Sequence, residues 1–223
     1  MRIERTRLIR RGGGHRDARL FVIATEGKET ERQYFAALKS QDLIDRRRVT
    51  VRVLPGDSAS SPSHVMARLD EFHSGHRLHS SLDQLWLVLD LDHWDKPGHI
   101  HNFTRVAQEA RAKGYFVAVS NPCFELWLLL HFTDDIADIR AISSTSEACE
   151  ACRREIRRLC GSYDGASLRE ERYTSRRVDD AVERAEALEG APEDRWPQQV
   201  GTRVHRLVRE LVDSARRNPG VRR

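Results

Sequence analysis

Short apolar segments alternate with amphipathic segments along the first half of the chain. Residues 19–25 (RLFVIAT) form an apolar run of the length that is typical of a buried strand. A Glu-Gly-Lys turn follows, and Thr30 can cap a helix that extends to about residue 40. The pattern then repeats, with strands predicted at residues 48–54, 84–91 and 115–119 and helices at residues 62–72 and 102–113.

This order of strands and helices predicts an α/β fold. Near-continuous apolar strands separated by helices are typical of a parallel sheet that is covered by helices on both faces. After Pro122 the pattern is helical, with helices predicted at residues 123–132, 145–159, 177–188 and 202–215. We therefore expect a flexible basic arm at residues 1–18, an α/β core at 19–132 and a helical C-terminal part at 133–223 packed on that core.

Acidic side chains follow two of the predicted strands at the points where the strands end. Glu26 comes directly after the first strand, and Asp90 and Asp92 close the third. The carboxyl ends of parallel strands meet at one edge of the sheet, where ligands of such folds bind. Asp90 and Asp92 are two residues apart, so their side chains point to the same face of an extended chain.

Two neighbouring carboxylates repel each other, and burying them does not stabilise a fold unless a cation or solvent compensates the charge. A hard cation with oxygen ligands resolves the repulsion, and Mg²⁺ commonly takes one or two carboxylates together with waters and a substrate phosphate. These acids therefore indicate either a site for Mg²⁺ or Mn²⁺, or a solvated strand end. Both alternatives stay open here, because loops are polar and acids at strand ends are common.

The charge is unevenly distributed along the chain. The 38 basic and 34 acidic residues give a net charge of +4, but residues 1–19 hold seven arginines and two acids, as do residues 203–223. Arginine can contact phosphate through two hydrogen bonds, so basic ends favour a nucleic-acid partner, RNA or DNA. A general bias toward arginine is the other explanation, since only four basic residues are lysine. The glycines at residues 12–14 predict an irregular N-terminal arm.

The composition excludes several classes of protein. An apolar fraction of 39% and a charged fraction of 32% indicate a globular chain rather than a disordered one. The longest apolar run, residues 124–132, contains Glu125 and His131 and is too short to cross a bilayer. We recognise no signal peptide. The four cysteines fit a reducing compartment better than a disulfide scaffold, so we expect a cytoplasmic protein with no membrane partner.

Several segments together resemble the RloB-like family. They are FVIATEGKETE at residues 21–31, LVLDLDHW at 87–94, SNPCFELW at 120–127 with HF at 131–132, and PQQVGTRV at 197–204. The resemblance runs in order over most of the chain, and residues 120–131 are its most specific part. It implies a Toprim-related fold, and the family occurs beside restriction-modification and phage-defence genes.

The resemblance also implies a Toprim-type site. In such sites the Glu of a Glu-Gly turn acts as an acid/base or a metal ligand, and the aspartates of an Asp-x-Asp motif bind Mg²⁺. By position these residues are Glu26, Asp90 and Asp92. Their order, with Glu after the first strand and the aspartates after the third, is the order of Toprim proteins.

Residues near the acids are further candidates. Glu125 lies just beyond the fourth strand in an apolar helix, where an isolated buried carboxylate would be costly. We interpret it as a further catalytic acid that binds metal or positions substrate, and an acid favoured by the helix dipole is the alternative. Ser120 and Asn121 would contact phosphate or a metal-bound water.

Two more residues complete the candidate site. Lys28 would contact phosphate or form an ion pair with Glu29 or Glu31. His93, next to the two aspartates, would touch substrate.

These observations favour a metal-dependent phosphodiesterase, an endonuclease on RNA or DNA with a role in phage defence. A small nucleotide substrate, a partner ATPase and a homo-oligomer are all compatible with the sequence. The alternative is a non-catalytic basic subunit that binds or senses nucleic acid. Phosphatase chemistry of the haloacid-dehalogenase type ranks last, because there the Asp-x-Asp pair follows the first strand.

Other motifs are absent or incomplete. The sequence has no Walker motif, so ATP hydrolysis by this chain is not predicted. Cys149 and Cys152 have the spacing of two zinc ligands, but no matching pair of Cys or His follows at the spacing of a zinc finger. We interpret them as small residues at a helix-packing surface.

Overall fold

The computed structural model describes residues 7–9, 15–40, 43–56, 61–92, 97–190 and 194–216 of the 223-residue chain. Its main strands are β3 (Arg19–Thr25), β4 (Val49–Val53), β5 (Gln84–Asp90), β6 (Phe116–Asn121) and β7 (Gly201–Thr202). The longer helices are α1 (Thr30–Ser40), α2 (Pro62–Gly75), α3 (Pro97–Ala112), α6 (Thr145–Cys160), α7 (Ser175–Ala187) and α8 (Val204–Arg216). The short helices are α4 (Phe124–Leu129), α5 (Ala137–Arg140) and the 3-10 turn η1 (Glu170–Arg172).

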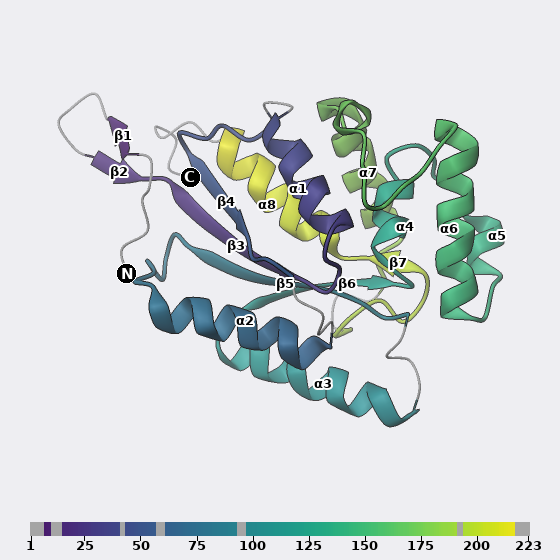
Figure 1. The fold of residues 1–223 in the computed structure, drawn as a ribbon, viewed down its shortest axis with the longest axis horizontal. Coiled ribbons are helices and arrows are strands. Elements are labelled where there is room, and N and C mark those ends of the chain that lie inside the picture. The colour runs from purple at the N-terminus through teal and green to yellow at the C-terminus, as the bar shows by residue number, and fades with distance from the viewer. Residues whose placement is uncertain are drawn as a thin grey trace.

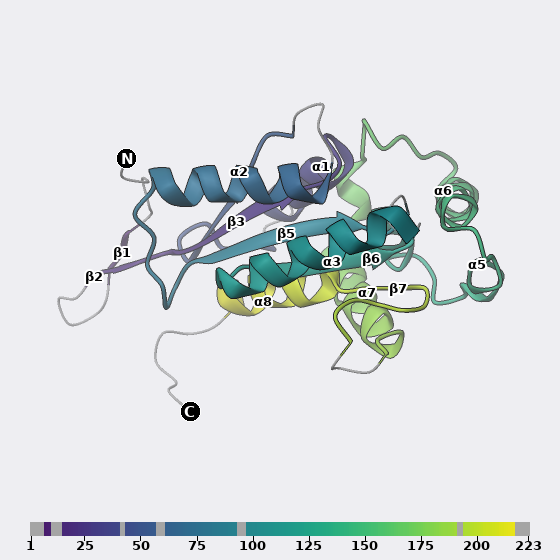
Figure 2. The same cartoon turned by 90° about the horizontal axis from the view of Figure 1, so that it is seen from below.

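The main strands form one sheet in the order β4-β3-β5-β6-β7. β4, β3, β5 and β6 are parallel, whereas β7 pairs antiparallel with the end of β6. Helices α2 and α3 cover one face of the sheet, and α1 and α8 cover the other (Figures 1 and 2). Helices α4, α5 and α6 lie beyond the carboxyl ends of the strands (Figure 1). The α/β fold with a mostly parallel sheet is therefore the one that the alternation of elements predicts.

The two central strands are buried on both faces. Every residue of β3 after Arg19 is buried, as are the five middle residues of β5. Phe21 and Ile23 face the core beneath α1 and α8, whereas Leu20 and Val22 face the core beneath α2 and α3. Two-sided burial explains why these segments are continuous apolar runs rather than alternating ones.

Most predicted elements differ from the structure only at their ends. The strand at residues 19–25 and the helix at residues 30–40 have the predicted bounds. The helix predicted at residues 123–132 ends earlier, at Leu129. None of the described helices is long and apolar enough to cross a membrane.

The helical C-terminal part also contributes to the sheet. The helix predicted at residues 202–215 begins only at Val204, because Gly201 and Thr202 form β7. Thr202 pairs with Ser120 of β6, and the backbone N–H of Arg203 donates to the carbonyl of Val119 at 2.9 Å. A strand of two residues leaves no period in the sequence, so side-chain pattern alone could not reveal it.

The N-terminal arm is not irregular throughout. Strands β1 (Arg7–Ile9) and β2 (His15–Asp17) form a separate two-stranded antiparallel sheet. The prediction of an irregular arm is therefore wrong for these residues, because backbone pairing of two short segments does not require an apolar pattern. The glycines at residues 12–14 lie outside the described residues.

His131 is buried just after α4, with 1% of its surface exposed. Its Nδ1 lies 2.9 Å from the carbonyl oxygen of Trp127, and its Nε2 lies 3.2 Å from the hydroxyl of Tyr34. Burial lowers the pKa of His131 to about 3. The imidazole is therefore neutral, so that Nδ1–H donates to the carbonyl and Nε2 accepts from the hydroxyl.

We expect His131 to make the fold sensitive to acid. The unfolded chain binds a proton at this histidine near its usual pKa of about 6.5, and the folded chain does not, so stability falls as the pH drops below that value. The loss is at most about 1.4 kcal/mol per pH unit from this one group. Urea unfolding of wild type and His131→Phe between about pH 7 and pH 5 measures it, and the variant should show the shallower pH dependence.

The matched control is His101→Gln, because His101 is exposed on α3. This variant should keep the pH dependence of the wild type. An unchanged slope in His131→Phe would contradict the assignment of acid sensitivity to this buried imidazole.

Candidate active site

The carboxyl ends of β3 and β5 form a topological switch point. The chain leaves β3 through α1 to reach β4 on one side, and α2 then returns it to β5 on the other side of β3. In open α/β sheets, ligands bind where neighbouring connections diverge in this way. Glu26 follows β3 and Asp90 ends β5, so the topology brings both predicted acids to the switch point.

The side chain of Glu26 joins the two strand ends. Its backbone N–H donates to the carbonyl of Val88 at 3.0 Å, which extends the pairing of β3 with β5 by one residue. Its carboxylate Oε2 accepts the backbone N–H of Asp90 at 3.1 Å. With only 8% of its surface exposed, Glu26 is fixed at the sheet edge by backbone groups of both strands.

Glu31 is a further buried acid beside this turn. It lies in the first turn of α1 with 3% of its surface exposed, and its Oε1 accepts the backbone N–H of Gly27 at 2.8 Å. A Cβ at Gly27 would stand 2.2 Å from Oε2 of Glu31, so only glycine leaves room for the carboxylate. Burial raises the pKa of Glu31, although backbone hydrogen bonds oppose this, and the charge of Glu125 raises it further.

The sequence predicts Glu31 only as an ion-pair partner of Lys28. The missed signal is its position at the start of a predicted helix, where an acid can reach back to an N–H that precedes the helix. Glu29, the other expected partner of Lys28, pairs instead with Arg32. Lys28 itself is exposed.

Arg68 of α2 supports the turn after β3. Its guanidinium donates to the carbonyl of Thr25 at 2.6 Å and to the carbonyl of Pro55, after β4, at 2.9 Å. Its positive charge also opposes the rise in the pKa of Glu31. Arg68 thus connects the ends of two strands and places a cation beside the acids.

Burial and the neighbouring acids both oppose the charge of Asp90. Its Oδ1 is buried and has no hydrogen-bond partner among the residues that the structure describes. Burial raises the pKa of Asp90 well above its usual range, and neighbouring acidic groups raise it further. Those neighbours are Glu31, Cys123, Glu26 and Glu125. The carboxylate of Asp90 is therefore costly to ionise in the protein alone.

Asp92 lies against α6. Its Oδ2 is 3.9 Å from the thiol of Cys149, and its carbonyl accepts a hydrogen bond from Thr145 at 2.9 Å. A hydrogen bond with Cys123 raises the pKa of Cys149, burial adds to this, and the charges of Asp92 and Asp90 raise it further. Cys149 therefore lies close to both aspartates of the Asp-x-Asp motif.

Glu125 is held by residues of the helical C-terminal part. It is 8% exposed, and its Oε1 accepts hydrogen bonds from Nε of Arg153 at 2.9 Å and from the hydroxyl of Tyr163 at 3.1 Å. Arg153 lies on α6 and Tyr163 on the loop that follows it. Neither residue is predicted by the sequence pattern, because only the packing of α6 on α4 brings them to the acids.

Ser120 and Asn121 bind residues of the C-terminal part, and their predicted contacts with phosphate or a metal-bound water stay predictions. Oγ of Ser120 is 2.9 Å from Oγ1 of Thr202, and the side-chain amide of Asn121 donates to the carbonyl of Pro197 at 3.1 Å. These two side chains therefore connect β6 to the C-terminal part. His93 lies outside the described residues.

Among the described residues, the acids lie together as a cluster but do not form a complete set of metal ligands. In the part of the chain that the structure describes, no three Asp, Glu, His or Cys side chains are arranged to hold a metal ion as they stand. A magnesium site needs fewer than three protein ligands, since Mg²⁺ is commonly held by one or two carboxylates with waters and phosphate. The cluster of four buried or partly buried acids consists of Glu26, Glu31, Asp90 and Glu125, and is called the acid cluster below.

Fold and site together define an α/β protein with a cluster of acids at the switch point of a mostly parallel sheet. The family model described as RloB-like protein matches residues 21–211, so the chain belongs to the RloB-like family. The match includes the acid cluster and the C-terminal residues that contact it. No curated protein and no solved structure matched the chain.

We expect the Asp90→Asn variant to be more stable than the wild type in EDTA. The pKa of Asp90 is raised in the folded state, so the wild type loses stability as the pH rises above the usual aspartate pKa of about 4, whereas asparagine does not titrate. The gain should thus be larger at about pH 8 than at about pH 5, and each kcal/mol raises the Tm by roughly 2–4 °C. Thermal unfolding followed by circular dichroism measures it.

Asp83→Asn is the matched control. Asp83 is also buried, but its carboxylate accepts backbone N–H groups of Leu20 at 3.3 Å and His79 at 2.6 Å. Replacing this satisfied carboxylate should bring no gain in Tm. A lower Tm for Asp90→Asn at every pH would show that the charge of Asp90 is not a cost to the fold.

Proposed function

We propose that the protein is a metal-dependent phosphodiesterase, a Toprim-like endonuclease that acts on RNA or DNA. The observation that carries the proposal is the acid cluster at the switch point, in which Asp90 has a buried oxygen with no hydrogen-bond partner in the described part of the chain. Acids that raise one another's pKa destabilise a fold, and such groups gather mainly at functional sites. A site that binds cations and phosphate would explain why these acids lie together.

The residues fit Mg²⁺ or Mn²⁺ in their chemistry. Both ions prefer oxygen ligands, and the acid cluster offers carboxylates with at least one unsatisfied oxygen. Asp90 and Asp92 would hold the ion, and Glu26 would complete its ligands or act as the base. When bound, the ion supplies polarisation of the scissile phosphate and activation of water.

The protein side chains supply the remaining steps. Glu26, fixed at Oε2 by the amide of Asp90, accepts the proton of the attacking water at its carboxylate. Glu125 orients substrate, since Arg153 and Tyr163 hold its Oε1 in place. Arg153, together with Arg68, brings positive charge to this acidic edge, which a polyanionic substrate requires.

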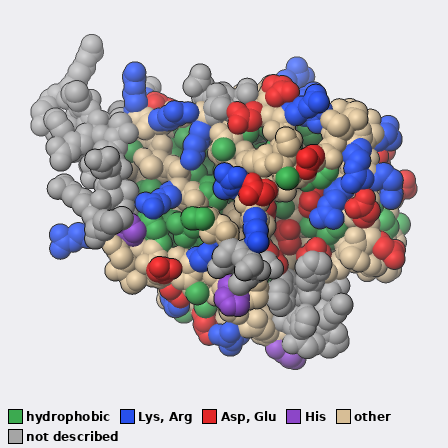
Figure 3. Space-filling model, viewed as in Figure 1, with side chains coloured by type: hydrophobic (Ala, Val, Ile, Leu, Met, Phe, Trp, Pro, Cys, Tyr) green, Lys and Arg blue, Asp and Glu red, His purple; other side chains and the backbone are tan. Residues whose placement is uncertain are grey.

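Basic side chains on α6, the helix that carries Arg153, favour a nucleic-acid substrate. Figure 3 shows Lys and Arg side chains, in blue, together with acids over the part of the molecule formed by α6. Arg154, Arg157 and Arg158 are exposed on that helix. Such residues can follow a phosphate backbone, with affinity that falls as salt rises.

The place of this nuclease is proposed from its family. Members of the RloB-like family occur beside phage-defence genes, so we infer a role in defence, with a partner ATPase as the trigger.

We expect one Mg²⁺ or Mn²⁺ ion to bind per chain. Binding should raise the Tm of the wild type, because an ion that binds only the folded state stabilises it. Asp90→Asn should weaken binding at least about tenfold, which is the lower end of the effect of losing a metal-site residue. Isothermal titration calorimetry measures this, with Asp83→Asn as the control that binds like the wild type. Equal affinity in wild type and Asp90→Asn would remove Asp90 from the site.

We expect metal-dependent cleavage of nucleic acid. The panel contains tRNA, total RNA, and single-stranded, linear and supercoiled DNA, each with Mg²⁺, Mn²⁺ or EDTA. Glu26→Gln and Asp90→Asn should each lower the rate at least about 100-fold, as loss of an acid/base or ligand group does, and remain folded by circular dichroism. Asp83→Asn should cleave like the wild type.

Either variant cutting as fast as the wild type would make this mechanism wrong. Salt-dependent binding of nucleic acid without cleavage under either ion would favour the alternative, a non-catalytic subunit that binds or senses nucleic acid.

A further inference from the structure

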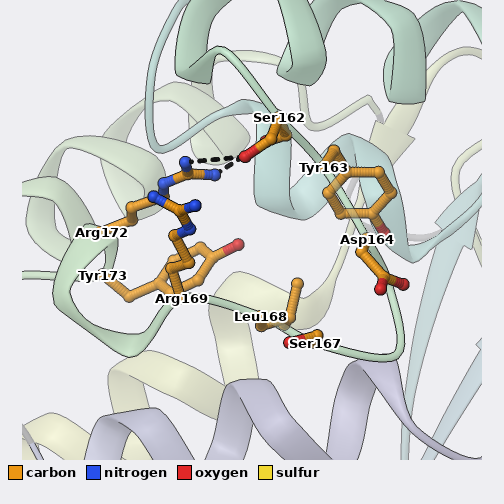
Figure 4. Close-up of a pocket in the computed structure, with 8 residues that line it drawn as sticks. All are labelled: Ser162, Tyr163, Asp164, Ser167, Leu168, Arg169, Arg172 and Tyr173. Atoms are coloured by element: carbon orange, nitrogen blue, oxygen red, sulfur yellow. Dashed lines mark hydrogen bonds between the residues drawn. The ribbon is translucent and has the colours of Figure 1, made fainter.

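The loop between α6 and α7 encloses a cavity of about 260 Å³. Figure 4 shows Tyr163 and Tyr173 on opposite sides of it, with Ser162, Ser167 and Arg169 among the other lining residues. The lining therefore combines two aromatic rings, hydroxyl groups and a guanidinium. None of these residues was singled out by the sequence pattern.

The loop is fastened to α1, so the cavity is preformed. Oε1 of Gln33 accepts the backbone N–H of Leu168 at 2.7 Å, and Nε2 of Gln33 donates to the carbonyl of Ala166 at 2.5 Å. The hydroxyl of Thr30 donates to the carbonyl of Gly165 at 3.0 Å. Both Thr30 and Gln33 belong to the helix that also carries Glu31.

Arg172 fixes the other side of the loop. Its guanidinium donates to the carbonyl of Ser162 at 2.8 Å and to the carbonyl of Cys160, at the end of α6, at 2.9 Å. Arg172 is therefore occupied by the loop itself. Arg169, by contrast, is exposed at the cavity and offers its charge to a ligand.

Tyr163 separates the cavity from the acid cluster. Its ring lines the cavity, and its hydroxyl donates to Oε1 of Glu125 at 3.1 Å. The two sites are thus one tyrosine side chain apart. A ligand that filled the cavity would lie next to a phosphate bound at the acid cluster.

We propose that this cavity binds an unpaired nucleobase of the substrate strand, so that the strand is single-stranded where it is cut. This inference rests on the proposed nuclease function. Proteins stack splayed-out bases on aromatic rings and arginine planes, and Tyr163 and Arg169 supply such groups here, whereas Tyr173 is only 2% exposed and closes the base of the cavity. A base inside a duplex is stacked and paired, and it would first have to leave the helix.

A second hollow extends the same surface. It has a volume of about 460 Å³, and Arg176, Arg177 and Arg184 line it together with Phe132. Tyr173 lines the first hollow, and the next residue in the chain, Thr174, lines the second. Three guanidiniums that line one hollow, beside the carboxylate of Asp180, suit the phosphates of neighbouring nucleotides, which favours a strand over a free nucleotide.

Binding in EDTA tests this without any metal-dependent reaction. Fluorescence anisotropy would compare labelled single-stranded RNA and DNA with matched duplexes, using a nucleoside monophosphate as competitor. We expect Ser167→Trp, which fills the cavity, and Arg169→Ala to weaken single-strand binding about 5- to 100-fold, the range of one lost stacking interaction. Duplex binding should change less than about twofold, because a paired base does not enter the cavity.

Two matched controls separate the cavity from its surroundings. Ala166→Trp adds the same ring to the same loop, at a residue that does not line the cavity. Arg140→Ala removes an exposed arginine of α5 outside the cavity. Neither should change the ratio of single-strand to duplex affinity.

Equal affinity of the wild type for single strands and duplexes, or normal single-strand binding by Ser167→Trp, would overturn the proposal. Competition by the monophosphate at the concentration of the oligonucleotide would assign the cavity to a free nucleotide and overturn the role of the strand. Base binding in EDTA with no cleavage in Mg²⁺ would contradict the nuclease function and support the base-binding cavity. Duplex cleavage that Ser167→Trp leaves unchanged would support the nuclease function and contradict the base-binding cavity.

Discussion

Backbone N–H groups hold the acids at the carboxyl edge of the sheet against their mutual repulsion. The amide of Asp90 binds Glu26, and the amide of Gly27 binds Glu31. Both amides have positions set by the pairing of β3 with β5 and by the turn that follows β3. The spacing of the charges is therefore set by strand register, and a slip of one residue would turn the side chains of β5 to the opposite face.

The positive charges around this edge compensate only part of the negative charge. The charge of Arg68 opposes the rise in the pKa of Glu31, and Arg153 binds Glu125. The pKa of Asp90 nevertheless stays well above its usual range. Under the proposed function a bound cation would complete the compensation, whereas in the protein alone the acids raise the pKa of Asp90.

The central strands and the acids at their ends could be predicted from the sequence, because two-sided burial and strand ends leave local signals. RLFVIAT and QLWLVLD need no knowledge of their neighbours to be recognised as strands. Arg153 and Tyr163 could not be predicted, since they meet Glu125 across 28 and 38 residues. β7 could not be predicted from the sequence, because a strand of two residues is defined by its pairing with β6 and not by its own side-chain pattern.

The position of β7 and α8 late in the chain has a consequence for synthesis. β6 and the core beneath α8 stay incomplete until residues 201–216 have left the ribosome. Thr202 and Pro197 bind Ser120 and Asn121, which lie just before Glu125. A nascent chain that has not yet supplied these residues would thus carry its acids on an unfinished sheet edge.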